Sequence, residues 1–106
     1  MTEKTSTNHL TEENSYKKIK NKDVGIERIL EIINRLTDEH DGCPWDKIQT
    51  NITLAKHTIE EAYEVADAIE SRSNHEICQE LGDLLFNILF HIHIATQNGS
   101  FTLTDV

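Results

Sequence analysis

The chain has 106 residues, a formal net charge of −9 and 27% charged residues. A chain of this length forms one domain with a modest core. The acidic balance argues against the phosphate backbone of a nucleic acid as a partner. The two cysteines, Cys43 and Cys78, follow no apolar leader, and no apolar run is long enough to span a bilayer. These features favour a protein of the reducing cytoplasm, without disulfides or a membrane partner.

The first 22 residues are predominantly polar, and Leu10, Tyr16 and Ile19 are their sizeable apolar side chains after Met1. This composition predicts a disordered tail over 1–22 and a single helical domain over 23–106. Because so small a domain has little apolar area to bury, we expect a metal ion or a second subunit to help stabilise it.

A first amphipathic helix is predicted from about Asp23 to Leu36. Its apolar residues recur at the i, i+3, i+4, i+7 spacing of one helix face: Ile26, Ile29, Leu30, Ile33 and Leu36. Gly42 and Pro44 then break the pattern and predict a loop over residues 37–50.

Two longer helices follow the loop. The second is predicted from about Asn51 to Ser71. Ser73 and Glu76 have the spacing of a capping box, in which Ser73 starts the third helix and Glu76 reaches back to it. The third helix is expected to run to about Gln97 and to end at Asn98-Gly99. Three helices with short connections predict an all-α helical bundle.

The chain closes on FTLTDV, which alternates like a β-strand but has no predicted partner strand. Thr104 is therefore interpreted as the cap of a further helix.

Apolar side chains surround almost the whole circumference of the third helix, which predicts a central position in the bundle or between two subunits. They are Leu81, Leu84, Leu85, Phe86, Ile88, Leu89, Phe90, Ile92 and Ile94. Because three helices of one chain cannot cover all of these residues, we expect a homodimer or homotetramer. Phe90→Asp is expected to dissociate it.

Five carboxylates crowd the segment IEEAYEVADAIE, residues 59–70. On a helical wheel, Glu61 lies inside the apolar arc of the second helix, and Glu60 and Glu64 lie at its edge. Asp67 and Glu70 point away from the arc and are interpreted as surface charges. Only the first three carboxylates therefore need a special explanation.

The third helix carries a narrow polar stripe of Glu80, Asp83, Asn87 and His91. A solvated face is the ordinary interpretation of such a stripe. Here large aliphatic and aromatic residues flank it, which favours an inward-facing position. His91 lies two turns beyond Asp83, so it is interpreted as a hydrogen-bonded core histidine rather than a metal ligand.

Four carboxylates that face each other in a core require compensation, since burial of an unpaired charge is costly. They are Glu61, Glu64, Glu80 and Asp83. Protonation of some of them is one solution. A hard divalent cation with oxygen ligands is another, and this ligand set favours Mg²⁺, with Mn²⁺ as a substitute.

The two halves of this pattern resemble the MazG nucleotide pyrophosphohydrolases, whose signature is EExxE followed by ExxD. Here the halves are Glu60-Glu61-Ala62-Tyr63-Glu64 and Glu80-Leu81-Gly82-Asp83. The segments DGCPWDKIQT and NGSFTLTDV also resemble the amino-terminal MazG domain in order and spacing. The resemblance covers about Ile26 to Val106.

The resemblance implies an all-α fold and Mg²⁺-dependent hydrolysis of nucleoside triphosphates to the monophosphate and pyrophosphate. It also implies that Glu61, Glu64, Glu80 and Asp83 are metal ligands and that Glu60, beside them, positions or deprotonates the attacking water. Dimers or higher oligomers are typical of the family. Cations that contact phosphate are expected from Lys47, Lys56 or Arg72, or from a neighbouring subunit.

Two further residues are candidates for substrate binding. Trp45 either stacks on a base or closes one end of the bundle, and Lys56 either approaches the site or is simply solvated.

Two other functions are alternatives to the enzyme hypothesis. One is a non-catalytic helical protein that binds metal and nucleotide or docks on a partner. Another is a structural bundle whose carboxylates are protonated or solvated.

Overall fold

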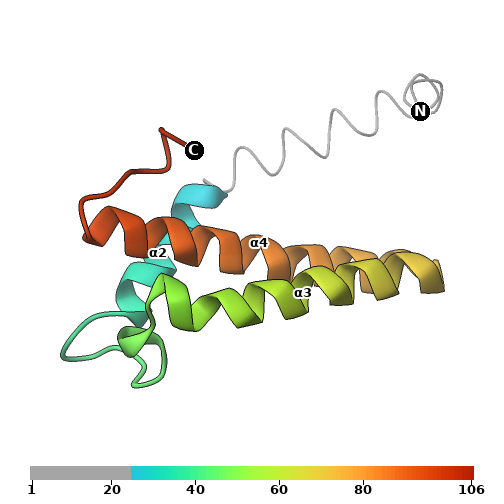
Figure 1. The fold of residues 1–106 in the computed structure, drawn as a ribbon, viewed down its shortest axis with the longest axis horizontal. Helices are drawn as coiled ribbons and strands as arrows, with labels where there is room; N and C mark the ends of the chain where they lie inside the picture. Colours follow the sequence, from blue (N-terminus) through green and yellow to red (C-terminus); the bar gives the residue numbers. More distant parts are fainter. Residues whose placement is uncertain (1–24) are drawn as a thin grey trace.

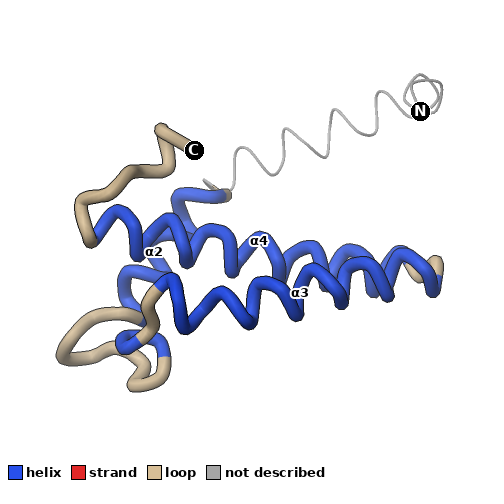
Figure 2. The backbone as a smooth tube through the Cα atoms, in the orientation of Figure 1, coloured by secondary structure: helices blue, strands red, loops and turns tan. Residues whose placement is uncertain are grey.

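The computed structural model describes residues 25–106, which form three α-helices and one short 3₁₀ helix. They are α2 (Ile26–Leu36), η1 (Asp46–Ile48), α3 (Asn51–Ser71) and α4 (Asn74–Gln97). No strand occurs within this part of the chain, so the predicted all-α class is confirmed (Figure 2). The predicted tail over 1–22 and the predicted helix start at Asp23 lie outside the described residues.

The helices α3 and α4 lie side by side as a long antiparallel hairpin, and α2 crosses one end of it (Figure 1). The contacts of α2 are chiefly with α4, so α4 touches both other helices and is the central element, as its composition predicts. None of the helices in the described residues is long and apolar enough to cross a membrane.

The start of α3 is fixed by a capping box that sequence analysis did not identify. The Thr50 hydroxyl accepts from the Thr53 N–H at 3.2 Å, and the Thr53 hydroxyl accepts from the Thr50 N–H at 2.8 Å. Both partners are threonines rather than the usual Ser/Thr and Glu pair. The helix therefore begins at Asn51, at its predicted residue.

The start of α4 confirms one half of the predicted capping box and corrects the other. The Ser73 hydroxyl accepts from the Glu76 N–H at 3.2 Å, as predicted. The Glu76 carboxylate accepts instead from the Ser71 hydroxyl at 3.1 Å. This happens because the tight turn between α3 and α4 brings a side-chain donor from the preceding helix within reach.

The cap predicted at Thr104 is wrong by two residues. Thr102 starts the terminal turn, since its N–H and its hydroxyl both donate to Asp105 Oδ2, at 2.9 and 3.2 Å. The carboxylate three residues after Thr102 selects that position, as in a capping box.

The core lies at the end of the hairpin where α2 packs. Its buried side chains are Ile33, Leu54, Leu89, Phe90, Ile92 and Ile94. They come from all three helices, and three helices meet only at this end. Toward the α3–α4 turn the hairpin consists of α3 and α4 alone, so no third helix of the described residues packs on its outer faces.

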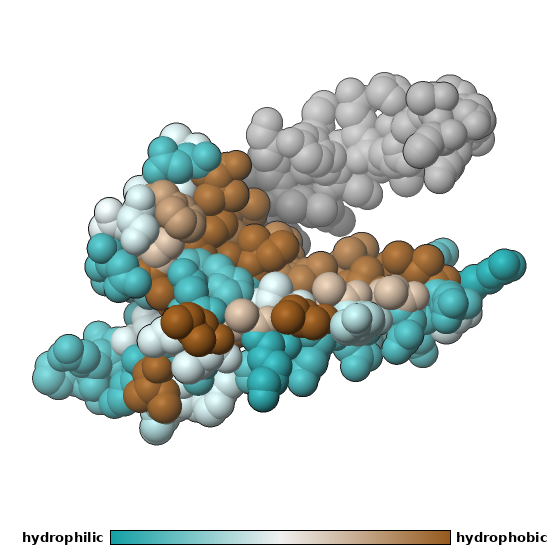
Figure 3. Space-filling model, in the orientation of Figure 1, coloured by the Kyte–Doolittle hydropathy of each residue, from teal (hydrophilic) through white to brown (hydrophobic). Residues whose placement is uncertain are grey.

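Apolar side chains on those outer faces are exposed. The larger ones are Ile59 (58%), Ile69 (55%), Leu81 (49%), Leu85 (41%) and Ile88 (40%). In Figure 3, brown apolar residues continue along α4 toward the tip of the hairpin, while charged and polar residues line the α3 edge. The expected apolar excess on the third helix is therefore present, and on α4 it lies at Leu81, Leu85 and Ile88.

Phe90 does not belong to that surface. Its side chain is 1% exposed and lies in the core, with an edge-on contact to Phe86 at a centroid distance of 6.1 Å. The expectation that Phe90→Asp tests subunit pairing is wrong, because the buried charge would unfold each chain first. Leu81 and Leu85 are the appropriate positions for such a test.

Two histidines join the helices through hydrogen bonds. His91 Nε2 lies 2.6 Å from the Thr58 hydroxyl and its Nδ1 lies 2.6 Å from Asn51 Oδ1, which links α4 to α3. The interpretation of His91 as a hydrogen-bonded histidine is confirmed, and its side chain is partly buried rather than in the core. His93, to which the sequence assigned no role, is buried, and its Nε2 lies 2.9 Å from the hydroxyl of Thr37 at the end of α2.

Acidification is expected to destabilise the fold through these histidines. Burial lowers the pKa of both His91 and His93 below the ordinary histidine value of 6.5. The unfolded chain therefore binds protons more readily, and stability falls as the pH drops from about 7 through the histidine pKa range. Each histidine contributes at most about 1.4 kcal/mol per pH unit.

Thermal unfolding measured at about pH 7.5 and at about pH 5.5, on either side of the ordinary histidine pKa, tests this expectation. His93→Gln should make the pH dependence shallower, because an amide can replace the bond to Thr37 but does not titrate. His75→Gln is the matched control, since His75 is exposed on α4. An equal slope for wild type and His93→Gln would contradict the role of His93.

Candidate metal centre

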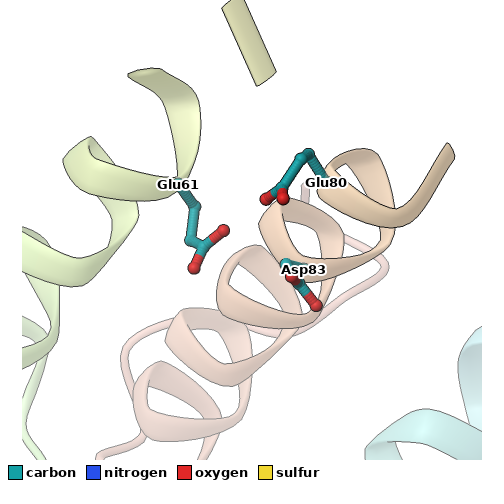
Figure 4. A group of neighbouring side chains, drawn as sticks. All are labelled: Glu61, Glu80 and Asp83. Atoms are coloured by element: carbon teal, nitrogen blue, oxygen red, sulfur yellow. The ribbon is translucent and has the colours of Figure 1, made fainter. Parts of the chain in front are cut away.

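Three carboxylates meet in the gap between α3 and α4. Glu61 comes from α3, and Glu80 and Asp83 lie one turn apart on α4. One carboxylate oxygen from each lies within 4.8 Å of the others. Figure 4 shows Glu61 and Glu80 extending toward each other from facing helices, with Asp83 beside them. The two ends of the sequence motif are thus brought together by the antiparallel hairpin.

The electrostatics of Glu61 show that its negative charge is poorly compensated by the protein alone. Burial is the largest cause of a raised pKa at Glu61. The negative charges of Asp83, Glu80 and Glu64 raise that pKa further. Glu61 Oε1 is also shielded from solvent and has no hydrogen-bond partner. A buried acceptor without a partner is rare in folded proteins and calls for an explanation.

A hard divalent cation fits this donor set. All the converging atoms are carboxylate oxygens, which Mg²⁺ and Mn²⁺ prefer. The unpartnered Oε1 atom of Glu61 supplies a ligand that the protein itself leaves unsatisfied. Because Asp83 is exposed, the group is open on one side, as a centre that also admits a substrate must be.

The other predicted site carboxylates lie around this group. Glu64 is exposed one turn further along α3 and lies outside the group of three, although its charge acts on Glu61. Its role as a fourth ligand stays a prediction. Glu60 is exposed, and its Oε1 lies 3.8 Å from His57 Nδ1. Asp67 and Glu70 are exposed on α3, in agreement with their interpretation as surface charges.

The candidate substrate-binding residues lie on the loop and the first turns of α3. Trp45 is half exposed, and its ring packs edge-on against His57. Lys56 is exposed on α3. Of the other expected cations, Lys47 donates to the Glu39 carbonyl at 3.0 Å, and Arg72 caps α3 in a left-handed conformation at the hairpin tip.

His57, which contacts both Trp45 and Glu60, was not predicted from the sequence. One signal was available: His57 and Glu61 are four residues apart on one helix, so they share a face. The contact to Trp45 had no such signal, because it depends on how the loop folds back onto α3.

The fold and the site together define an all-α protein with a cluster of three carboxylates between two antiparallel helices. Comparison with known proteins shows the family to which the chain belongs. Residues 49–106 match the family described as MazG nucleotide pyrophosphohydrolase domain. The chain belongs to the MazG family.

Curated relatives support this assignment. Over 81 residues, 76% of this chain, it is 47% identical to a nucleoside triphosphate pyrophosphohydrolase of Escherichia coli K12, of which it covers 31%. Over 87 residues, 80% of this chain, it is 39% identical to the nucleoside triphosphate pyrophosphohydrolase/pyrophosphatase MazG of Thermotoga maritima, of which it covers 34%. The chain thus spans about a third of the length of these relatives.

Proposed function

We propose that this protein is a Mg²⁺-dependent nucleoside triphosphate pyrophosphohydrolase that cleaves between the α- and β-phosphates. The observation that carries the proposal is the convergence of Glu61, Glu80 and Asp83 around an unpartnered carboxylate oxygen. Family membership supports the substrate class, since relatives are named for this activity. The acidic charge of the chain is compatible with an anionic substrate, because bound cations invert the local charge.

The chain's own residues have distinct roles in the proposed reaction. Glu61, Glu80 and Asp83 would hold Mg²⁺, with Glu64 as a fourth ligand from the edge of the site. When bound, Mg²⁺ lowers the pKa of water and neutralises phosphate oxygens. Glu60, exposed beside Glu61, would orient the attacking water or accept its proton, with Glu61 assisting. Attack at the α-phosphorus releases pyrophosphate and leaves the monophosphate. Lys56 would approach the phosphates from α3.

We also propose that the active form is a homodimer or homotetramer. The support comes from the exposed apolar side chains on the two-helix part of the hairpin, including Ile59, Leu81 and Leu85. This part also carries Glu61, Glu80 and Asp83. Pairing of two hairpins would bury those faces and exclude water around the carboxylates. A shared core of this kind matches the isologous interfaces of most small homo-oligomers.

A panel assay tests the proposed reaction. Incubation with each common NTP and dNTP and Mg²⁺ is expected to release pyrophosphate and no orthophosphate. Removal of Mg²⁺ with a chelator is expected to stop the release, and Mn²⁺ is expected to restore part of it. Orthophosphate would indicate attack at the γ-phosphorus and contradict the proposal. Calorimetric binding of nucleotide without turnover would favour the non-catalytic binding protein instead.

A further inference from the structure

Trp45 occupies an unusual position for the single tryptophan of the chain. Its side chain is 48% exposed although it lies on a hydrogen-bonded loop. The indole packs edge-on against the His57 ring, with a centroid distance of 5.3 Å and an interplanar angle of 83°. One part of the indole is therefore held by the protein while a large part of its apolar surface stays open.

The loop that carries Trp45 is held by bonds on both sides of it. Before Trp45, the Cys43 N–H donates to the Leu36 carbonyl at 2.8 Å. After it, the Gln49 side chain donates to the Trp45 carbonyl at 2.9 Å. At Gly42, an added Cβ would lie 2.4 Å from the carbonyl oxygens of Leu36 and Asp38, so only glycine allows this closure. The indole is thus exposed because these hydrogen bonds and Gly42 fix the conformation of the loop.

His57 connects this aromatic surface to the carboxylates. His57 and Glu61 are four residues apart on α3, so they share a face and differ by about 6 Å along the helix axis. His57 Nδ1 also lies 3.8 Å from Glu60 Oε1. The indole therefore lies about one helical turn and one ring contact away from the proposed metal ligands. A nucleotide whose phosphates occupy the carboxylate group would bring its base to this distance.

We propose that Trp45 is the surface on which the nucleobase of the substrate stacks, and that His57 is the positioning residue that holds the indole in place. This inference rests on the proposed function, since it assumes a nucleotide with its phosphates at the carboxylates. An open indole suits any base, because every base has a π-face. It therefore predicts that affinity depends on the presence of a base more than on its identity. A neutral base also meets no repulsion from Glu60.

Fluorescence provides a test that needs binding but not turnover, since all tryptophan emission comes from Trp45. The probes are α,β-imido GTP, α,β-imido UTP and inorganic tripolyphosphate, each with Mg²⁺. Both nucleotides are expected to quench the emission saturably, whereas tripolyphosphate should compete for the site without comparable quenching. Equal quenching by tripolyphosphate would overturn the inference. Calorimetric nucleotide binding without any quenching would overturn it as well.

The same titration separates this inference from the proposed reaction. Quenching by nucleotides in a protein that releases no pyrophosphate would contradict the reaction and support the stacking surface. Pyrophosphate release without quenching by the bound analogue would support the reaction and overturn the stacking surface. Absence of any nucleotide binding would overturn both.

Kinetics of variants provide an independent test. Trp45→Ala is expected to raise KM about 5- to 100-fold for every nucleotide, with kcat nearly unchanged, since base stacking contributes to binding. Trp45→Phe should retain most of the affinity. Phe101→Ala is the matched control, because Phe101 has a similar exposure of 43% but lies near the carboxyl terminus, and its KM should not change. An equal effect of both alanine variants would overturn the inference.

His57 is tested by rescue. His57→Ala should raise KM, and His57→Phe should restore it, because phenylalanine keeps an aromatic ring against the indole but cannot interact with Glu60 as an imidazole does. A fall in kcat with unchanged KM in His57→Ala would show that His57 acts through Glu60 and overturn its positioning role. A change of oligomeric mass in Trp45→Ala would identify the indole as a subunit contact and overturn the stacking role.

Discussion

Glu61→Gln is expected to stabilise the metal-free protein and to abolish its stabilisation by Mg²⁺. The first effect follows because the amide removes a charge that burial and the neighbouring Asp83 and Glu80 disfavour. The second follows because the variant loses a ligand with an unpartnered oxygen. In wild type, Mg²⁺ at 100 times its Kd should add about 2.7 kcal/mol to the unfolding free energy, since it binds only the native state.

Thermal unfolding with and without Mg²⁺ measures both effects. Glu80→Gln should likewise abolish the response to Mg²⁺. Glu70→Gln is the control on α3, because Glu70 is exposed and lies outside the carboxylate group, so its response should equal that of wild type. A melting temperature of wild type that does not respond to Mg²⁺, with the helices intact, would contradict the metal centre.

Glu61→Gln is also expected to lose pyrophosphohydrolase activity by a factor of about 10³, since a bound metal ion contributes several kcal/mol to transition-state stabilisation.

The pH dependence of the stability of the metal-free protein gives a further check on Glu61. The native pKa of Glu61 is raised, so its contribution to stability is present at low pH and is lost as the pH rises through the native value, above 4.5. Glu61→Gln should lack this loss.

Leu85→Asp is expected to convert the oligomer to a particle of 12.2 kDa while the helices remain intact. Leu85 is 41% exposed on the hairpin face that we propose as the subunit interface, so a charge there is tolerated in the single chain but not in the pair. Activity should fall with dissociation, because water would enter the site. Light scattering at micromolar concentration and far-ultraviolet circular dichroism measure the mass and the helix content.

Two comparisons make this test specific. Ile48→Asp places the same charge on an aliphatic residue of η1 that is 69% exposed, and it should leave the mass unchanged. Phe90→Asp should lose helix content rather than only dissociate, because Phe90 is 1% exposed in the core of each chain. A wild-type particle of 12.2 kDa, or an unchanged mass in Leu85→Asp, would rule out this interface.

Local patterns were sufficient to predict the helices. The predicted bounds of the second helix, Asn51 to Ser71, are those of α3, and the predicted end of the third helix at Gln97 is that of α4. Apolar periodicity and caps act over one or two turns, so they can be identified in the sequence without knowledge of the fold. The cap predictions failed where a neighbouring residue offered a competing hydrogen bond, as when the Glu76 carboxylate accepted from Ser71 across the turn between α3 and α4.

The carboxylate site was predictable in composition but not in geometry. The wheel position of Glu61 inside an apolar arc separated it from Asp67 and Glu70, which are exposed. Convergence of Glu61 with Glu80 and Asp83 depends on how two helices align across a turn. Periodicity predicted that four carboxylates face each other, but it did not indicate that Glu64 lies outside the group that Glu61, Glu80 and Asp83 form.

By itself, therefore, the sequence determined that this protein is all-helical, where α3 begins and ends, and that Glu61 is set apart from the surface charges Asp67 and Glu70. All of these follow from side-chain spacing along one helix. The tertiary structure decided which apolar residues are core and which are surface, as Phe90 and Leu85 show. It also decided that Trp45 meets His57. Both outcomes depend on where α2 and the loop cross the hairpin, and such crossings are set by packing between segments far apart in the chain.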